Sequence, residues 1–359
     1  MKRVKFRTED INEKEFARAL RKRVHAYFKD NNISIHGDYR MYFKSVVMLG
    51  VYLAPFVILL TVPLSPWAAL GMTVLIGIGA AGVGMSVMHD GAHGAYSPKA
   101  SVNDLAASTM LLMGSNTFNW KIQHNLLHHT FTNMFDFDPD ISTKAIIRLS
   151  EQAPLKKYHR FQQFYSFFLY GLMTFMRFFG EIGVLLKNNR MGIVQEQKAN
   201  FKLEFVKLIA TKVLYLAIVF GLPLLLTEYT FWQVLLGFIV MQVTAGMIMS
   251  TVFQMAHVVE GVYQPLPDEH NIIHNEWVVH QLHATSDFGR KNGLLSWYIG
   301  GLDYQVEHHL FPNTCHVHYP AIAPIVEATA KEYGFTYNLK PDFRHALVSH
   351  FRKLRELGR

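Results

Sequence analysis

Residues 67–88 read WAALGMTVLIGIGAAGVGMSVM and contain no charged side chain. A run of this length reaches the ~20 residues that a helix needs to cross ~30 Å of hydrocarbon. Three other apolar runs of comparable length lie at residues 46–64, 205–226 and 231–256. Short turns connect the first run to the second and the third to the fourth. The sequence therefore predicts an all-α membrane protein with four transmembrane helices in two hairpins.

The overall composition agrees with a membrane location. Half of the 359 residues are hydrophobic and 17% are charged, compared with about 25% charged in an ordinary soluble domain. The net charge of +8 comes from basic residues that flank the apolar runs. This placement is typical of contact with lipid headgroups, so we expect the lipid bilayer as a partner and no nucleic acid. The single cysteine, Cys315, excludes an internal disulfide and a cysteine-rich zinc module.

Basic residues are distributed unevenly along the chain. No Lys or Arg occurs between Ser45 and Pro98 or between Val213 and Gly289, so both hairpin turns lack positive charge. Because basic loops tend to stay in the cytoplasm, this pattern predicts an integral multi-pass membrane protein with both termini on the cytoplasmic side. The N-terminal segment 1–44 is polar and does not resemble a cleavable signal peptide.

Charge and hydrophobic pattern also indicate the nature of two further segments. Residues 161–186 are apolar and aromatic but contain Arg177 and Glu181, which favours a helix at the membrane interface over a spanning helix. Residues 321–359 have the pattern of a polar helical tail on the cytoplasmic side. The expected organisation is therefore an N-terminal segment 1–44, a main domain 45–320 and a tail 321–359.

The second apolar run contains a motif that also occurs in nucleotide-binding proteins. Gly77-Ile-Gly79-Ala-Ala-Gly82 matches G-x-G-x-x-G, but that fingerprint requires a preceding strand and a βαβ unit. Here it lies inside a long apolar run. Small residues at this spacing more often allow close packing of helices in lipid, so we expect a packing role.

Histidines gather in three short motifs. The first is His89-Asp90-Gly91-Ala92-His93, the second is HNLLHH at residues 124–129 and the third is QVEHH at residues 305–309; His257 stands alone at the end of the fourth run. On a helix, residues four apart share one face, so each motif directs its imidazoles at a common position. The second and fourth runs end on the same side of the membrane, which predicts that all these histidines lie near one surface.

The number of histidines indicates the kind of site. Neutral imidazole is a good ligand for iron, zinc, copper or nickel. Eight histidines exceed the four ligands of a tetrahedral zinc ion. The motifs together therefore predict a site for two metal ions on the cytoplasmic side of the membrane.

The motifs H-D-G-A-H, H-N-L-L-H-H and Q-V-E-H-H, in this order, resemble the three histidine boxes of the membrane fatty acid desaturases. The third motif opens with glutamine and is followed by Leu310-Phe311-Pro312, which resembles the front-end branch of Δ6-type and Δ5-type enzymes. The resemblance runs from about Ser45 to Pro320. It implies four transmembrane helices with a cytoplasmic cap, two non-haem irons and O2-dependent insertion of a cis double bond into an acyl chain.

By position, the resemblance also implies the metal ligands. They are His89, His93, His124, His128, His129, His257, His308 and His309. Gln305 stands where many relatives have histidine, so three roles stay open for it: a direct ligand, a ligand through water, or no ligand.

Other residues near the boxes are expected to support the site. Asp90, Asn125 and Glu307 lie within the boxes and are candidates for fixing imidazole tautomers. Trp120 and Trp297 are candidates for contact with the acyl chain.

Several other polar residues close to the motifs are not expected to bind the metals directly. Asp136, Asp138 and Asp140 are expected to have a structural or ligand-supporting role, and His280 and His283 a supporting or substrate-contacting role. His270, His274, His316 and His318 are expected to be surface or packing residues.

The remaining expectations concern partners and alternatives. The chain has no H-P-G-G motif of a fused cytochrome b5 domain, and the 44-residue leader is too short for one. Electrons are therefore expected from a separate cytochrome b5, ferredoxin or rubredoxin with its reductase. The expected substrate is the acyl chain of an acyl-CoA or of a membrane lipid. Two alternatives stay open: a di-iron fatty acyl or alkane hydroxylase, and a His-rich metal transporter. A transporter needs ionisable groups near the middle of its spans, and we expect these spans to lack them.

Overall fold

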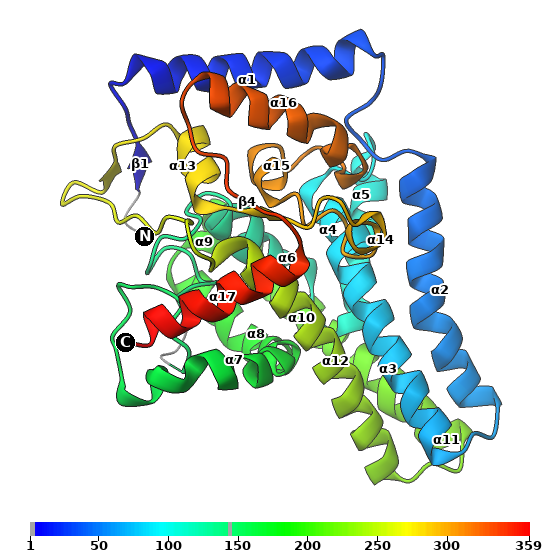
Figure 1. Ribbon diagram of the computed structural model, residues 1–359. Coiled ribbons are helices and arrows are strands. Elements are labelled where there is room, and N and C mark those ends of the chain that lie inside the picture. Colours follow the sequence, from blue (N-terminus) through cyan, green and yellow to red (C-terminus); the bar gives the residue numbers. More distant parts are fainter. Residues whose placement is uncertain (1–3, 143–145) are drawn as a thin grey trace.

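The computed structural model describes residues 4–142 and 146–359, and within them four helices are long and apolar enough to cross a membrane. The first is α2 (Tyr39–Thr61) and the fourth is α12 (Phe231–His257). The second joins α3 (Pro66–Val83), η1 (Gly84–Met88) and α4 (His89–His93), and the third joins α10 (Phe201–Leu216), η5 (Ala217–Gly221) and α11 (Leu222–Leu226). Figure 1 shows α2, α3, α11 and α12 extending together from the rest of the molecule. The predicted all-α class with four membrane-capable helices is confirmed.

These helices extend beyond the apolar runs at the end that carries the histidines. The first begins at Tyr39 instead of the expected residue 46, because the Asp38 side chain caps it by accepting a hydrogen bond from the backbone of Arg40. The second continues to His93, five residues past the apolar run. Hydropathy marks only the part of a helix that lies in hydrocarbon, so it cannot locate such polar extensions.

The glycines of the G-x-G-x-x-G motif lie where α3 packs against its neighbours. A Cβ atom on Gly79 would lie 2.5 Å from the backbone nitrogen of Tyr52 in α2. A Cβ atom on Gly77 would lie 2.6 Å from the carbonyl oxygen of Met241 in α12. Only glycine permits such close backbone approach, so the motif packs helices together, as predicted from its context.

The third span contradicts one expectation. Lys212, in the middle of Phe201–Leu226, is buried, and its Nζ lies 3.0 Å from Oε2 of Glu181. The same ammonium group donates hydrogen bonds to the carbonyls of Gly114 and Phe178 at 3.2 and 2.7 Å. A buried charge is tolerated at this depth when it is paired and hydrogen-bonded. The expectation that the spans lack ionisable groups is therefore wrong at Lys212.

The aromatic segment near residues 161–186 forms two helices, α7 (Gln162–Gly171) and α8 (Met173–Arg190). The helical segments Lys157–Gly171 and Met173–Arg190 meet at 70°, so they do not form one straight span. Phe164 and Phe168 on α7 are 67% and 70% exposed. Interfacial placement stays a prediction, which this exposed aromatic face supports.

A helical cap covers the ends of the spans that carry the histidines. In it, α1 (Ile11–Asp30) lies beside α16 (Tyr319–Glu332), close to α13 (Trp277–Ala284) and α15 (Gln305–Leu310) (Figure 1). One core contains side chains from all four helices, among them Phe16, Val279, Val306 and Ile322. The N-terminal segment predicted at residues 1–44 thus contributes α1 to this core, and α16 continues across the predicted boundary at residue 320.

The remaining elements are short. Two parallel pairs of two-residue strands join β1 (Lys5–Phe6) to β2 (Ile272–Ile273) and β3 (Asp287–Phe288) to β4 (Leu339–Lys340). The other helices are α5 (Ala100–Ser108), η2 (Thr109–Met113), α6 (Thr117–Lys121), η3 (Ile122–His128), η4 (Lys157–Phe161), α9 (Ile193–Glu196), α14 (Gly293–Tyr298), η6 (His316–His318) and α17 (Phe343–Leu357).

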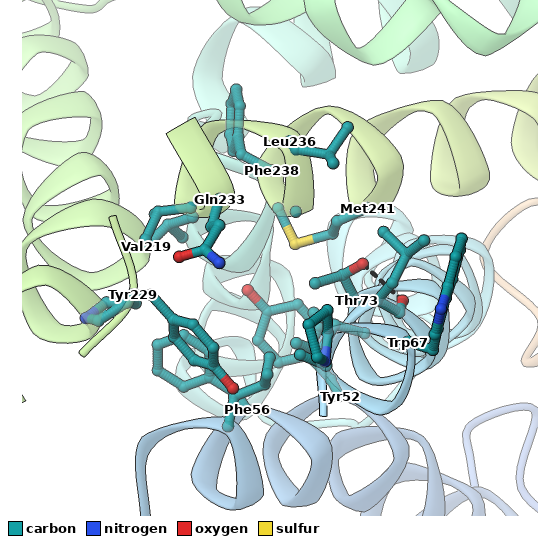
Figure 2. A pocket seen from close by; sticks show the side chains of 18 residues that line it. Tyr52, Phe56, Trp67, Thr73, Val219, Tyr229, Gln233, Leu236, Phe238 and Met241 are labelled. Atoms are coloured by element: carbon teal, nitrogen blue, oxygen red, sulfur yellow. Dashed lines mark hydrogen bonds between the residues drawn. The ribbon is translucent and has the colours of Figure 1, made fainter. Parts of the chain in front are cut away.

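An apolar cavity of about 270 Å³ lies between α2, α3, η5 and α12 (Figure 2). Trp67 and Tyr229, which border the two hairpin turns, line part of it. Ile76 is its last lining residue along α3 and precedes His89 by 13 residues of one continuous helix, which is about 20 Å at ~1.5 Å per residue. The cavity therefore lies at the end of the bundle remote from the histidines and shares no residue with the histidine groups.

Candidate metal centre

The first two histidine boxes lie on distorted helical turns. The second span passes through the π-helical turn η1 before His89 and ends at His93, where Gly94 takes a left-handed conformation. The second box lies within the π-helix η3, and the backbone of His129 donates to the carbonyl of His124 five residues earlier, at 3.0 Å. A π turn holds more residues than an α turn, so His128 and His129 both reach the site from one turn.

The imidazoles form two neighbouring groups. In the first, His89, His93, His124 and His308 each offer a ring nitrogen within 4.8 Å of the others. In the second, the nitrogens of His128, His257 and His309 lie within the same distance. The structure thus brings together residues from both hairpins and from the cap.

His129 connects the two groups. One of its ring nitrogens lies within 4.8 Å of a ring nitrogen of His308 and of His309. Its Nε2 also lies 3.2 Å from Nε2 of His124. The side-chain nitrogen of Gln305 lies 3.0 Å from Nε2 of His257. All eight predicted histidines and Gln305 therefore share one region.

The ring nitrogens without hydrogen-bond partners in this cluster are suited to bind metal ions. The buried Nε2 atoms of His93, His128, His308 and His309 have no hydrogen-bond partner among the described residues, and neither have Nδ1 of His129 and His257. Buried polar atoms are normally paired, so the unpaired Nε2 atoms of these clustered rings are suited to bind metal ions. An all-nitrogen donor set of this size fits two transition-metal ions.

Burial keeps the rings in the form that binds metal. It lowers the pKa of His124, His129, His308 and His309 well below the usual value, and the neighbouring imidazoles lower it further. These side chains are therefore neutral at physiological pH, and neutral imidazole is the ligand form.

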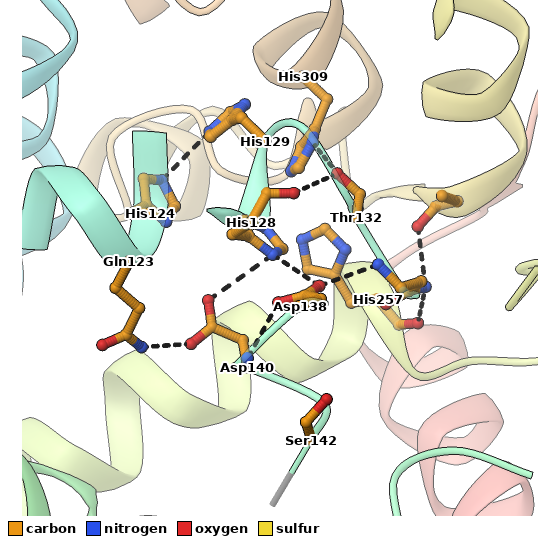
Figure 3. Close-up of polar contacts among 12 residues, drawn as sticks. Gln123, His124, His128, His129, Thr132, Asp138, Asp140, Ser142, His257 and His309 are labelled. Carbon is orange, nitrogen blue, oxygen red and sulfur yellow. Dashed lines mark hydrogen bonds and ion pairs between the residues drawn. The ribbon is translucent and has the colours of Figure 1, made fainter. Parts of the chain in front are cut away.

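Three of the predicted ligands are held by partners at Nδ1, which leaves Nε2 free to bind a metal ion. His128 donates from Nδ1 to Oδ2 of Asp138 at 2.9 Å (Figure 3), and Gln281 Oε1 lies 2.9 Å from Nδ1 of His309. The hydroxyl of Tyr319 lies 3.2 Å from Nδ1 of His308. Such partners fix both the tautomer and the direction of a ligating ring.

Asp138 is the charged member of this support. It also accepts a hydrogen bond from the backbone of Asn133, whose side chain donates to the carbonyl of His257. Burial lowers the pKa of His128, but Asp138 and Asp140 more than offset this and the net pKa is raised. Asp136, by contrast, is exposed, so only Asp138 and Asp140 of the three predicted aspartates reach the cluster.

The box residues expected to orient imidazoles have other contacts. Asn125 donates to the carbonyl of Ala92 at 2.9 Å, which ties the second box to the first, and Oδ1 of Asp90 lies 3.9 Å from Nδ1 of His89, beyond hydrogen-bond range. Asp90 instead accepts from Nδ1 of His316 at 2.8 Å. Spacing along the chain could not distinguish these partners from a neighbouring imidazole.

Glu307 also has no imidazole partner in the described chain. Its Oε1 lies 2.9 Å from the hydroxyl of Tyr337, which is also 2.6 Å from Oδ2 of Asp287. Burial raises the pKa of Glu307 well above its usual range, and the Asp287 carboxylate acts in the same direction. Glu307 therefore joins the third box to the C-terminal segment.

The two tryptophans differ in position. Trp120 stacks on His124 with ring centroids 4.3 Å apart and also lies edge-on to His89 and His93. Trp297 lies instead beside the ammonium group of Lys44, 5.5 Å from its ring centroid. Only Trp120 covers the histidine cluster directly.

The remaining histidines lie outside the two groups. His280 is buried against Phe6, and His283 packs near Phe335. His316 and His318 are buried packing residues, whereas the side chains of His270 and His274 are 75% and 70% exposed.

The spans and the buried imidazole cluster define a class: helical membrane proteins with a histidine-rich site that could hold metal ions at one end of their spans. A model of the family "fatty acid desaturase" matches residues 65–341. The chain is 34% identical to the sn-1 linoleoyl-lipid 6-desaturase of Synechocystis sp., over 99% of this chain and 98% of that protein. It is 32% identical to the enzyme of the same name from Arthrospira platensis (96% and 92%) and 34% identical to the acyl-lipid (8-3)-desaturase of Physcomitrium patens (97% and 73%).

The chain therefore belongs to the fatty acid desaturase family, and the front-end resemblance of its third box is confirmed. It is an enzyme of lipid metabolism that introduces a double bond into a fatty acyl chain. The hydroxylase and transporter alternatives are not favoured by these matches.

Proposed function

We propose that the eight box and α12 histidines hold two non-haem irons, with Gln305 beside the second. The observation that carries the proposal is the pair of buried imidazole groups connected by His129, which contain ring nitrogens without hydrogen-bond partners among the described residues. When bound, such irons would activate O2 to oxidise an unactivated C–H bond.

The chain's own residues would then control geometry and water. Asp138, Gln281 and Tyr319 hold the Nδ1 atoms of His128, His309 and His308, which directs their Nε2 atoms inward. All three ligands are 0% exposed, so bulk water does not reach the ring atoms that face the site. Trp120 covers His124 with an apolar ring face suited to an acyl chain.

We propose an acyl group esterified in a membrane lipid as the substrate, with the new double bond at position 6. The printed names of the two cyanobacterial relatives support both points, because the alignment with each covers more than nine-tenths of this chain and of the relative. The glutamine that opens the third box agrees with a front-end enzyme.

We also propose that the active site and both termini face the cytoplasm and that electrons arrive from a separate carrier, a ferredoxin, a cytochrome b5 or a rubredoxin. The absence of Lys and Arg from both hairpin turns supports this orientation.

The test is expression in a bacterium or yeast supplied with linoleate, followed by gas chromatography and mass spectrometry of the acyl chains. We expect a new double bond at position 6, first in the membrane-lipid fraction, and about two irons per purified chain. His309→Ala should abolish the product and lower the iron content, whereas His270→Ala, an exposed histidine outside the cluster, should change neither. Exclusively hydroxylated products, or labelled acyl-CoA consumed before any lipid, would contradict the proposal.

A further inference from the structure

A second cavity lies between the start of α7 and the end of α17, away from the histidines. It has a volume of about 600 Å³ and is lined by Arg160, Phe161, Gln163, Phe164, Phe351, Arg355 and Arg359. Three guanidinium groups and three phenyl rings thus border one space. A surface that combines clustered cations with apolar rings is suited to an anionic amphiphile.

The charges of this cavity are not neutralised within the described chain. No carboxylate of the described residues lies within 4.0 Å of the guanidinium groups of Arg160, Arg355 or Arg359. Glu356, the nearest acid along α17, is instead paired with Lys353 at 2.8 Å. The cavity therefore retains a net positive charge and is complementary to a phosphate or sulfate group.

One polar atom in the cavity wall also lacks a partner. Gln163 is 7% exposed, and its Oε1 has no hydrogen-bond partner among the described residues. This oxygen is itself buried, so the Gln163 side chain must turn toward the cavity before the oxygen can accept a hydrogen bond from a ligand hydroxyl. A ligand that carries both an anionic group and hydroxyls would satisfy the arginines and Gln163 together.

The position of α7 places this cavity at the membrane. Ser250 of α12 donates to the carbonyl of Tyr170 near the end of α7, and Gly246 packs against Gly171. Gly246 and Ser250 precede His257 by 11 and 7 residues, which is about 10 to 16 Å deeper along the span at ~1.5 Å per residue. The end of α7 therefore lies beside α12 at a depth within the span, and Arg160, in η4 directly before α7, lies at the opposite end of this helix.

Phenyl rings line the cavity, and a further exposed ring follows them along α7. Phe164 contacts Phe351 with centroids 5.6 Å apart, and the guanidinium of Arg160 lies 4.6 Å from the ring of Phe161. Phe168, one turn further along α7, is 70% exposed on the same helix. An acyl chain can follow these rings into the leaflet while its headgroup stays at the arginines.

We propose that this cavity binds one anionic phospholipid of the surrounding leaflet, with its phosphate at Arg160, Arg355 and Arg359 and a headgroup hydroxyl at Gln163. The lipid is a bound partner distinct from the acyl substrate, because the cavity shares no residue with the histidine cluster. A bound lipid of this kind would fix α7 and α17 against the bilayer beside the end of α12.

Native mass spectrometry of the purified iron-loaded enzyme tests this proposal. The probes are phosphatidylglycerol, phosphatidylcholine of the same acyl composition and inorganic phosphate. We expect one phosphatidylglycerol per chain to be retained at least fivefold more tightly than phosphatidylcholine, and not to be displaced by millimolar phosphate. Equal retention of the two lipids, or ready displacement by inorganic phosphate, would overturn the proposal.

A charge-matched pair of variants locates the site. Arg160→Gln with Arg355→Gln should reduce phosphatidylglycerol retention to the level of phosphatidylcholine. Arg344→Gln with Arg352→Gln removes the same charge from exposed positions on α17 and should leave retention unchanged. Gln163→Leu, which keeps all charges, should reduce the preference for phosphatidylglycerol over phosphatidic acid, a lipid without headgroup hydroxyls. Equal losses in the two double variants would show a general charge effect and would contradict a defined site.

Discussion

At the scale of single residues, the function of the cluster depends on which nitrogen of each imidazole is free. Neutral histidine has one donor and one acceptor nitrogen, and the partner at one determines the role of the other. His128, His308 and His309 are held at Nδ1 by an aspartate, a tyrosine and a glutamine. Their Nε2 atoms all lack partners, so the three rings present equivalent ligand atoms from different segments.

Asp138→Asn tests the only charged partner among these. The amide keeps the size of the side chain but removes the negative charge beside the His128 ring, so the ring becomes a weaker ligand. We expect a 10- to 100-fold loss of affinity for one of the two irons. The iron content that remains after incubation with increasing concentrations of a chelator measures this loss of affinity. Asp136→Asn is the matched control, because Asp136 is exposed and has a positive φ of 68° that asparagine also adopts; an equal loss in both variants would contradict the role of Asp138.

The burial of His350 predicts that the stability of the folded protein depends on pH. It is fully buried, and its Nδ1 and Nε2 lie 2.7 Å from the carbonyl of Val258 and the hydroxyl of Tyr170. Burial lowers its pKa to about 4, whereas an unfolded histidine has a pKa near 6.5. The unfolded chain therefore binds the proton first, and stability is lost as the pH falls below about 6.5 toward 4.

The variant His350→Gln should remove this part of the pH dependence. Between pH 7 and pH 5.5 the wild type should lose about 1 kcal/mol more unfolding free energy than the variant. Thermal unfolding of the two proteins at both pH values gives the comparison. His25→Gln, at an exposed position in α1, should behave like the wild type. Parallel pH profiles for wild type and His350→Gln would refute the assignment.

The sequence predicted which histidines lie together but not the side chains that hold them, for a physical reason. The histidine boxes follow local spacing, and spacing on a helix is visible in sequence. Gln281 and His309 are 28 residues apart in the sequence, and Tyr319 and His308 are 11 apart. Only the folded cap brings these pairs together. Asn125 and Glu307 lie next to predicted ligands in the sequence, but neither side chain contacts an imidazole in the described structure.

At the scale of helices, apolar runs located all four spans but not their ends or their charges. α2 begins where Asp38 caps it, and the second box adopts a π turn that the α-helical spacing did not predict. Lys212 was missed as a buried charge because its partner, Glu181, lies on another helix. The context of the G-x-G-x-x-G motif, by contrast, correctly predicted helix packing.

Gly79→Ala and Gly71→Ala should change stability in opposite directions. A Cβ atom on Gly79 would lie 2.5 Å from the backbone of α2, which cannot move without separating the hairpin, whereas nothing lies within 4 Å of one on Gly71. We expect Gly79→Ala to destabilise the protein by about 1–3 kcal/mol and Gly71→Ala to be neutral or to stabilise it by up to about 1 kcal/mol. Thermal unfolding in one detergent measures both. Equal shifts would show that the α2–α3 contact does not depend on Gly79.

At the scale of the whole molecule, the proposed metal site combines segments from the membrane spans and from the cap. α4 and the end of α12 bring His93 and His257 from the bilayer, and α15 brings His308 and His309 from the cap. The cap core includes Phe16 of α1, so the N-terminal helix stabilises the third box through packing. Assembly of the site therefore requires the cap to pack in a fixed position on the ends of the spans that carry the histidines.

The orientation of this assembly can be measured directly because the protein has one cysteine, and it is buried. Cys315 is 0% exposed, so it should not react with a membrane-impermeant maleimide. Glu228→Cys places a thiol on the exposed turn between α11 and α12, and Lys22→Cys places one on the exposed face of α1. Because positive charge is confined to the segments on the histidine side, we expect Glu228→Cys to be labelled in intact cells and Lys22→Cys only after permeabilisation. The reverse pattern would place the iron site outside the cytoplasm, and with it the approach of any soluble electron carrier.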